Sequence, residues 1–321
     1  MAKRNHNNGI DGFINLNKAA GISSHTAMGK IRRLLDVKAG HAGTLDPAAW
    51  GVLPLCLGKA TRLAEYLVEG QKTYIGEVTL GIETDSYDGQ GQVLEMRDAA
   101  WVQKADILDI LPRFTGDILQ KPPMISALKR EGKPLYQLAR EGQLLELAPR
   151  PITIHALRYL GGHFDQAHPV FEIEISCSKG TYIRSLAHDI GQALGTVAHL
   201  SALCRKQVGL FHLADALTVE EIAARLAVGD RSFILPMSYP LGHLPLVVAS
   251  PAQYDRLLHG NAAPLPEEGW AACPVCRVED AAGRLLGMGQ ISPVEDGEGF
   301  QLKLNKVFAE IGEANERTGK I

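Results

Sequence analysis

The strongest constraint on the fold is a change of hydrophobic period in the second half of the chain. Apolar and polar residues alternate from Phe171 to Cys177, which is the period of a half-buried strand. From Thr181 to Leu194 the apolar residues instead recur at helical spacing, and Gly195 follows as a stop signal. This change predicts a strand followed directly by an amphipathic helix, so strands and helices are expected to share one core.

Other segments predict further elements of both kinds. The expected strands cover residues 12–17 and 74–82, and the expected helices cover residues 27–35, 104–111, 134–141 and 219–227. Thr218 and Glu221 form the capping box that predicts the start of the last helix. Residues 38–53 contain three glycines and a proline, which predict a structured loop rather than the interior of an element.

The pattern of apolar and turn-forming residues changes after Pro240. Short β-like runs at residues 244–248, 276–278, 285–288 and 300–304 alternate with turn-forming residues. We predict a first domain over residues 1–240 and a small β-rich domain, a compact barrel, over residues 243–321. A length of 321 residues agrees with two domains, on a prior of roughly 100–200 residues each.

Composition argues against several classes of protein. No apolar run approaches the roughly 18 residues that span a bilayer, and no apolar stretch of signal-peptide length follows the polar N-terminus. We therefore expect a cytoplasmic protein that does not contact a membrane. The five cysteines do not suggest a disulfide framework, and Cys273 and Cys276 have no second ligand pair nearby for a structural zinc, so no metal is expected.

The charge distribution is more informative than the net charge of −3. Residues 18–38 carry five basic side chains against Asp36, and residues 179–206 carry four against Asp189. Basic stripes of this kind can bind phosphates on a protein that is not basic overall. For either stripe alone, a solvated helix face is the simpler interpretation.

One loop combines features of a ligand site. Residues 40–47 read Gly-His-Ala-Gly-Thr-Leu-Asp-Pro. An isolated Asp-Pro pair is usually a turn. Here the glycines allow a ligand to approach the backbone closely, and loops on a rigid scaffold often carry catalytic residues. His41 in the same loop could contact a base or a phosphate, or be an ordinary surface residue.

This loop resembles the catalytic motif of TruB-type pseudouridine synthases, and three further stretches resemble motifs of that family in the same order. Residues 72–75 with 80–88 resemble the second motif, residues 122–136 the substrate-arm segment, and residues 177–184 the third catalytic motif. Leu203 followed by Arg205 resembles a later substrate contact. The resemblance runs from about residue 11 to 240, and the tail resembles a PUA-like RNA-binding domain.

The resemblance implies three catalytic residues. Asp46 is implied as the nucleophile, because conversion of uridine to pseudouridine needs a transient adduct that a carboxylate can form. Arg184 is implied as its partner, since a buried carboxylate needs a counter-charge and the guanidinium offers a planar fork. Tyr74 is implied as the platform on which the base stacks, and its hydroxyl could assist proton removal. Without the motifs, Arg184 would be read as a surface residue and Tyr74 as a core residue.

The resemblance also implies substrate-binding residues. The target base must leave its stack, which costs a few kcal/mol. His41 is implied to fill the gap or bind the flipped nucleotide, and the other implied contacts are the pocket walls Tyr182 and Leu203, Asp88 near the substrate, and Lys18 as a phosphate or support contact. Taken alone, Tyr182 and Leu203 would be core residues, Asp88 a turn residue and Lys18 a solvent-exposed one.

An RNA-binding arm is expected over residues 121–150. Lys129 and Lys133 are its implied phosphate contacts. Two positions depart from the family pattern: Ala19 stands where the family usually has proline after the lysine, and Ile125 stands where it has an aromatic residue. The first departure predicts a less rigid loop, and the second puts a stacking contact of the arm in question.

The expected fold is α+β, with a mixed, mainly antiparallel central sheet, flanking helices and a small C-terminal PUA-like β-barrel. The resemblance implies isomerisation of the uridine at position 55 in the T loop of transfer RNA, without a cofactor or metal. The expected partner is the tRNA T stem-loop, bound by a monomer with no obligate protein partner. The alternative is an RNA-binding or tRNA-folding protein that uses the same scaffold without catalysis. A nucleotide- or metal-dependent enzyme is disfavoured, because no P-loop, dinucleotide or zinc motif occurs.

Overall fold

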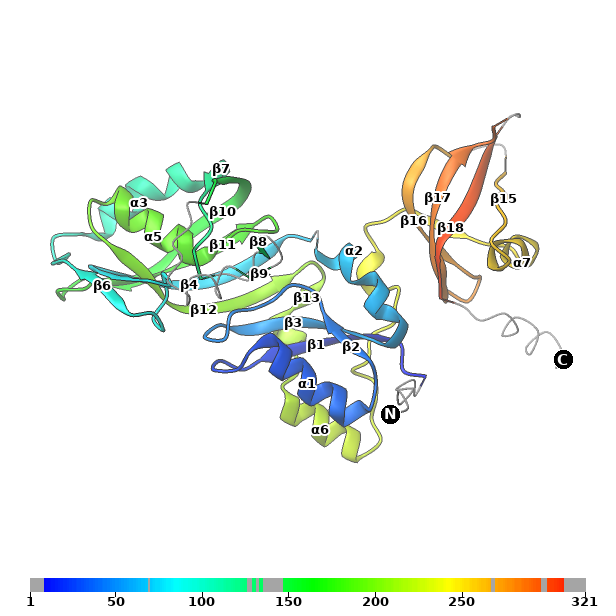
Figure 1. Ribbon diagram of the computed structural model, residues 1–321, viewed down its shortest axis with the longest axis horizontal. Helices are drawn as coiled ribbons and strands as arrows, with labels where there is room; N and C mark the ends of the chain where they lie inside the picture. The colour runs from blue at the N-terminus through cyan, green and yellow to red at the C-terminus, as the bar shows by residue number, and fades with distance from the viewer. Residues whose placement is uncertain are drawn as a thin grey trace.

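The chain folds into two sheets with flanking helices (Figure 1). The computed structural model describes residues 9–68, 70–125, 129–130, 133–134, 147–266, 269–295 and 299–308. A nine-stranded sheet forms the larger part of the molecule, and a five-stranded sheet forms the C-terminal part. Within the described ranges, no helix is both long and apolar enough to cross a membrane.

The large sheet consists of β1 (Gly12–Lys18), β2 (Ala39–His41), β3 (Trp50–Leu57), β4 (Lys72–Leu80), β7 (Gly116–Gln120), β10 (Arg150–His163), β11 (Val170–Cys177), β12 (Ala198–Val208) and β13 (Phe211–His212). Two hairpins lie outside it: β5 (Ile82–Thr84) with β6 (Val93–Met96), and β8 (Lys129–Arg130) with β9 (Lys133–Pro134). The helices of this part are α1 (Ser24–Leu35), α2 (Ala64–Val68), α3 (Lys104–Ile110), α5 (Ile183–Ala193) and α6 (Val219–Ala227). Short 3₁₀ turns are η1 (Gly58–Leu63), η2 (Leu111–Phe114), η3 (Leu213–Asp215) and η4 (Tyr239–Leu241).

The strand order in the large sheet is β1-β3-β12-β4-β11-β10-β7, with β2 beside β3 and β13 beside β12. The pairs are antiparallel except β3 with β12, which run parallel through Trp50–Cys204 and Gly51–Arg205. The expected α+β fold with a mixed, mainly antiparallel sheet is therefore confirmed. The single parallel pair joins the second and third strands of this order and brings the strand after Asp46 against the strand that carries Leu203 and Arg205.

Helices cover opposite sides of the two ends of this sheet (Figure 1). Helices α3 and α5 pack on β4, β10, β11 and β12 in one apolar cluster, which includes Phe171, Ile173 and Leu186. Helices α1 and α6 pack on β1 and β3 in a second cluster around Leu16 and Ile31. The amphipathic patterns of residues 171–194 thus do what their periods predict, since each buries one face against the other element. The loop that carries Asp46 lies between these two helical layers.

Strand β3 corrects the expectation of a loop up to residue 53. Gly51 has a φ of +107°, and a Cβ there would collide with the carbonyl oxygen of Arg205 on β12. Pro54 pairs with Asn15 on β1, and its carbonyl accepts a hydrogen bond from the Ala42 amide at 3.0 Å. Gly51 therefore marks a close contact between two strands, and Pro54 lies inside a strand that has the short strand β2 beside it. Local sequence signals cannot distinguish either position from a loop.

The arm is described only in part. Residues 129–130 and 133–134 pair as a short hairpin, so Pro134 lies in a strand rather than at the start of a helix. The rest of the helix expected over residues 134–141 lies outside the described residues. The expected helices at 104–111 and 219–227 are present as α3 and α6, and Thr218 and Glu221 make the capping box that the sequence predicts.

The C-terminal sheet has the order β14-β16-β17-β18-β15 and curls into a half-barrel, consistent with the expected PUA-like domain (Figure 1). Its strands are β14 (Leu246–Val248), β15 (Ala263–Pro264), β16 (Cys273–Glu279), β17 (Leu285–Pro293) and β18 (Phe300–Val307). Helix α7 (Pro251–Leu258) packs against it and was not anticipated, although Ser250 and Gln253 form a capping box at its start.

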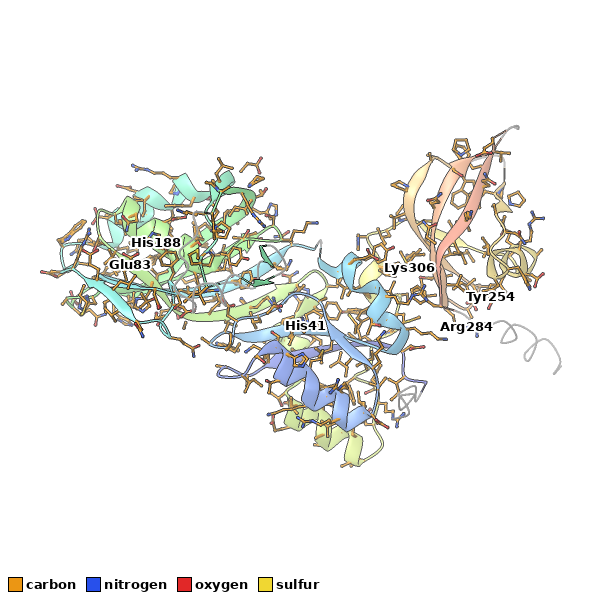
Figure 2. The ribbon with its side chains drawn as sticks, viewed as in Figure 1. His41, Glu83, His188, Tyr254, Arg284 and Lys306 are labelled. Atoms are coloured by element: carbon orange, nitrogen blue, oxygen red, sulfur yellow. The ribbon has the colours of Figure 1, made fainter. Side chains whose placement is uncertain are left out.

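A junction joins the two sheets through α2 and η1 on one side and β18 on the other. Lys306 contacts Glu65 and donates to the carbonyl of Arg62, and Figure 2 shows it directed towards α2. The Arg62 guanidinium lies 5.0 Å from the ring centre of Phe308, and its Nη1 donates to the Val307 carbonyl. Apolar residues close the junction: Leu285, Met288 and Phe308 pack in one cluster with Leu67, Phe211 and Leu241.

Candidate active site

The loop that carries Asp46 runs from β2 to β3 and is anchored at several points. The buried hydroxyl of Ser24 donates to the Leu45 carbonyl at 2.8 Å and accepts from the Leu45 amide at 2.9 Å. On the other side of Asp46, the Pro47 carbonyl accepts from the Gly21 amide at 2.8 Å. These bonds fix the backbone on both sides of Asp46, while 40% of its side chain stays exposed. The carboxylate is thus held in place yet open to a ligand.

Arg184 meets Asp46, as expected from the motifs. Its Nε lies 2.9 Å from Oδ2 of Asp46, and its side chain is only 6% exposed. The Nε–H is not aligned on this oxygen and makes no hydrogen bond, so the contact is an ion pair rather than a linear bond. The guanidinium therefore lies against the carboxylate as its counter-charge.

Three further groups lie against the Arg184 guanidinium. Nη1 donates to the carbonyl of Ser86 at 2.9 Å and to the carbonyl of Ile125 at 3.1 Å, and it lies 3.7 Å from Oδ2 of Asp88. Asp88 is itself fixed, since its Oδ1 accepts from the Ser86 hydroxyl at 2.6 Å and from the Gln90 amide at 3.0 Å. Asp88, expected near the substrate, is therefore placed as a second carboxylate beside Arg184.

Arg205 supports the same loop from behind, a role that sequence reasoning missed. It is 1% exposed, and its guanidinium donates to the carbonyls of Val52 at 2.7 Å, Gly43 at 3.0 Å and Thr44 at 3.4 Å. Gly43 has a φ of +86°, so the loop turns there through a conformation that favours glycine. The resemblance suggests a substrate contact at Leu203 and Arg205, whereas the Arg205 guanidinium donates to three backbone carbonyls.

Tyr74 lies on β4, next to Ile175 on β11 and Arg205 on β12. It is buried, and burial raises the pKa of its hydroxyl although the Arg205 guanidinium acts in the opposite direction. The phenol is therefore protonated at neutral pH. A protonated phenol suits contact with a nucleobase better than the role of an anionic proton acceptor.

Lys18 is buried at the end of β1, and its ammonium donates three hydrogen bonds to backbone carbonyls. The acceptors are Ala19 at 2.9 Å, Ile22 at 2.7 Å and Pro47 at 3.2 Å. Burial lowers the pKa of Lys18 to about 8, and the nearby Arg205 adds to the effect. Of the two roles weighed for Lys18, the geometry matches support of the loop rather than a phosphate contact.

Replacing Lys18 by methionine is expected to destabilise the fold by about 2–3 kcal/mol, because carbonyls that now have a donor would be left unsatisfied. Denaturant-induced unfolding measures this change. Lys38→Met, at an exposed lysine after α1, is the matched control and should change stability by less than about 0.5 kcal/mol. Equal stabilities for the two variants would contradict the support role.

The three expected pocket residues lie on three different elements. His41 is part of β2 (Figure 2), and burial, together with the nearby cation Arg205, lowers the pKa of its ring. Tyr182 is the N-cap residue of α5, two positions before Arg184. Leu203 is buried on β12 opposite Gly76.

The backbone of Lys129 and Lys133 forms the β8–β9 hairpin, and their side chains lie outside the described residues.

A cavity of about 280 Å³ is lined by residues from the end of β1 and the start of α6. Lys18, Lys30, Trp50 and Thr218 are among its lining residues, whereas Asp46, Tyr74 and Arg184 are not. In the described parts of the chain, no three His, Cys, Asp or Glu side chains gather in a possible metal site. The group of side chains with the features of a reactive centre is therefore the open face around Asp46.

Comparison with known proteins places the chain in a family. Residues 32–183 match the model of the TruB family pseudouridylate synthase N-terminal domain, and residues 184–241 match that of the tRNA pseudouridylate synthase B C-terminal domain. The chain is 47% identical to the tRNA pseudouridine synthase B of Symbiobacterium thermophilum, over 79% of this chain and 83% of that protein. It is 43% identical to the protein of the same name from Chromohalobacter salexigens, over 93% of this chain and 95% of that protein.

Solved structures of the same fold come from larger assemblies. An H/ACA ribonucleoprotein bound to a substrate RNA containing 2′-deoxyuridine includes a chain similar to this one, with a TM-score of 0.70 and 25% identity, over 93% of this chain and 85% of that chain. A Cbf5-Nop10-Gar1 complex gives a TM-score of 0.67 and 28% identity, with the same coverage of each chain. Taken with the sequence matches, these findings show that the chain belongs to the TruB family of pseudouridylate synthases.

Proposed function

We propose that this protein isomerises the uridine at position 55 in the T loop of transfer RNA, with Asp46 as the nucleophile. As a member of its family it is a tRNA pseudouridine synthase, an isomerase. The observation that carries the proposal is the 2.9 Å contact between buried Arg184 and Asp46, whose carboxylate is still 40% exposed. A carboxylate that is held by a cation and open on one side is the arrangement that a nucleophile for an extruded base requires.

The reaction conserves every atom of the uridine. The N1–C1′ bond breaks, the base turns, a C5–C1′ bond forms, and the proton on C5 is lost as N1 gains one. Asp46 forms a transient ester at the sugar C1′ or adds to C6 of the base, and is released at the end. Arg184 holds the carboxylate in place before attack, since its guanidinium lies 2.9 Å from Oδ2 of Asp46.

The residues around Asp46 supply a site for the flipped base. Tyr74 offers a ring against which the base stacks, and Tyr182 and Leu203 form the walls. Base–aromatic stacking contributes about 1–3 kcal/mol, which offsets part of the few kcal/mol needed to extrude the base. His41 is placed on β2, at the entrance to the Asp46 loop, where it can contact the flipped nucleotide.

The RNA body is held outside the catalytic cleft. Lys129 and Lys133 of the arm contact phosphates, and the PUA-like half-barrel contacts the RNA at a distance from the T loop. We further propose that the protein acts in the cytoplasm as a monomer. One chain supplies Asp46, Tyr74 and Arg184 to the same site, so no second copy is needed to complete it.

The alternative function is an RNA-binding or tRNA-folding protein that does no chemistry. Binding alone does not require a carboxylate to be paired with a buried arginine at the base site, because a carboxylate repels the phosphates of RNA. The Asp46–Arg184 pair therefore favours catalysis.

Incubation of the purified protein with unmodified tRNA, followed by mapping of pseudouridine at single-nucleotide resolution, tests the proposal. The reaction is expected to proceed in the presence of EDTA and to yield pseudouridine at position 55 only. A transcript with cytidine at position 55 is the control and should remain unmodified. Pseudouridine at another position would refute the assigned target, and no pseudouridine in any transcript would favour the binding protein.

A further inference from the structure

A buried polar clasp joins the end of β7 to the start of α5. The side chain of Gln120 pairs with the backbone of Tyr182 in both directions: its Nε2 donates to the Tyr182 carbonyl at 2.9 Å, and its Oε1 accepts from the Tyr182 amide at 2.8 Å. Gln120 is only 3% exposed. An amide that satisfies both groups of one residue fixes the position and the direction of the chain there.

Ser185 makes the third hydrogen bond of the clasp. Its hydroxyl donates to the carbonyl of Lys121 at 2.8 Å, and the residue is 1% exposed. Arg184, between the two clasp positions on α5, donates to the carbonyl of Ile125 at 3.1 Å. Three residues at the start of the helix thus hold three positions between 120 and 125, the segment that leads into the expected RNA-binding arm.

The helix start has no cap of its own side chains. Tyr182 is the N-cap residue, and its side chain makes no capping hydrogen bond. Ser, Thr, Asp or Asn usually fixes this position. Here Gln120 and Ser185 determine where the first turn lies, and that turn carries Arg184. A guanidinium that reaches across the site to Asp46 moves with any tilt of its helix, so the clasp controls the ion pair.

We propose that Gln120 and Ser185 are positioning residues that hold Arg184 against Asp46 and couple this pair to the base of the RNA-binding arm. The inference rests on the proposed roles of Asp46 and Arg184. It assigns a function to two residues that do not contact the substrate. RNA that displaces the 120–125 segment on binding displaces Arg184 with it, so engagement of the arm and alignment of the ion pair are one event.

The first test is Gln120→Leu, which keeps the bulk of the side chain and removes both bonds. We expect kcat to fall by about 10- to 100-fold, the effect of a misplacement of about 1 Å, with KM for the T-arm stem-loop changed by less than about threefold. Thr153→Val is the matched control, because it removes the bond of Thr153 to Asp117 across the same strand pair, away from α5. Its kcat should equal that of the parent protein.

The second test is a double-mutant cycle, which separates positioning from a general loss of structure. If Gln120 acts through Arg184, then Gln120→Leu should change kcat by less than about twofold in an Arg184→Lys background. A loss of the same size in both backgrounds would overturn the proposal. If Gln120→Leu does not fold, Ser185→Ala and Gln120→Glu replace it in the cycle, since each removes one bond of the clasp and keeps the rest.

Failure of the inference can be told apart from failure of the proposed function. A parent protein that forms pseudouridine and loses it with Asp46→Asn, but keeps full kcat in both Gln120→Leu and Ser185→Ala, refutes the clasp alone. An Asp46→Asn variant that remains active refutes the proposed function itself, whatever the clasp variants do.

Discussion

Replacing Asp46 by asparagine is expected to reduce pseudouridine formation by at least about 10⁴-fold while leaving RNA affinity within about threefold, because the amide has the same shape but is not a nucleophile. The hydrogen bonds that anchor the loop do not involve the Asp46 carboxylate, so the substitution should leave them intact. Single-turnover assays with a T-arm stem-loop measure the chemical step, and a filter-binding titration measures the affinity.

Asp280→Asn is the control for this experiment. Asp280 also pairs with an arginine, Arg284 at 2.6 Å, but it lies between β16 and β17 in the C-terminal sheet, whereas Asp46 lies beside the large sheet. Its loss should leave turnover unchanged. An Asp46→Asn protein that turns over as fast as the control would show that another group attacks the nucleotide.

Arg184→Lys is expected to lower kcat by about 10²–10³-fold, comparable to the removal of one fixed catalytic donor. Lysine keeps the positive charge, yet one ammonium cannot reach Asp46 at 2.9 Å and also the carbonyls of Ser86 and Ile125 on the other side of the guanidinium. Because Arg184 is buried beneath the carboxylate, the change should spare RNA affinity. Measured kcat and KM for the variant separate the two effects.

The matched control is Arg97→Lys, which alters an exposed pair with Glu95 at the end of β6. An exposed pair contributes little, so this variant should behave like the parent protein. If Arg184→Lys had normal kcat and a raised KM, Arg184 would be a binding residue, and its part in aligning Asp46 would be wrong.

Much of the fold follows from periodicity in the sequence. The alternation of residues 171–177 and the helical spacing that follows give β11 and α5, and both bury the faces that their patterns predict. Strand β3 does not follow, because Gly51 and Pro54 are explained only by neighbours distant in sequence: Arg205 on β12, Asn15 on β1 and Ala42. Local rules describe a residue and its near neighbours, and a central strand is specified by what lies beside it.

The candidate site is also predictable from the sequence only in part. The motifs identify Asp46 and Arg184, and their resemblance to a family, rather than any property of the two residues, implies that they meet. The groups that hold them in place carry no local signal. Gln120 ends an ordinary strand, and Arg205 belongs to what reads as a surface stripe of basic residues. Their roles depend on carbonyls that only the folded chain presents.

The junction between the two sheets has a consequence for how the chain can be divided. The family models match residues 32–241, whereas Lys306 and Phe308 near the other end of the sequence rest on α2 and η1. A protein cut after residue 241 would lose Leu285, Met288 and Phe308, and would expose to water the apolar residues that pack with them, Leu67 and Phe211 among them. The C-terminal half-barrel therefore stabilises the part of the chain that carries the large sheet, and a shortened chain is expected to be less stable than the intact one.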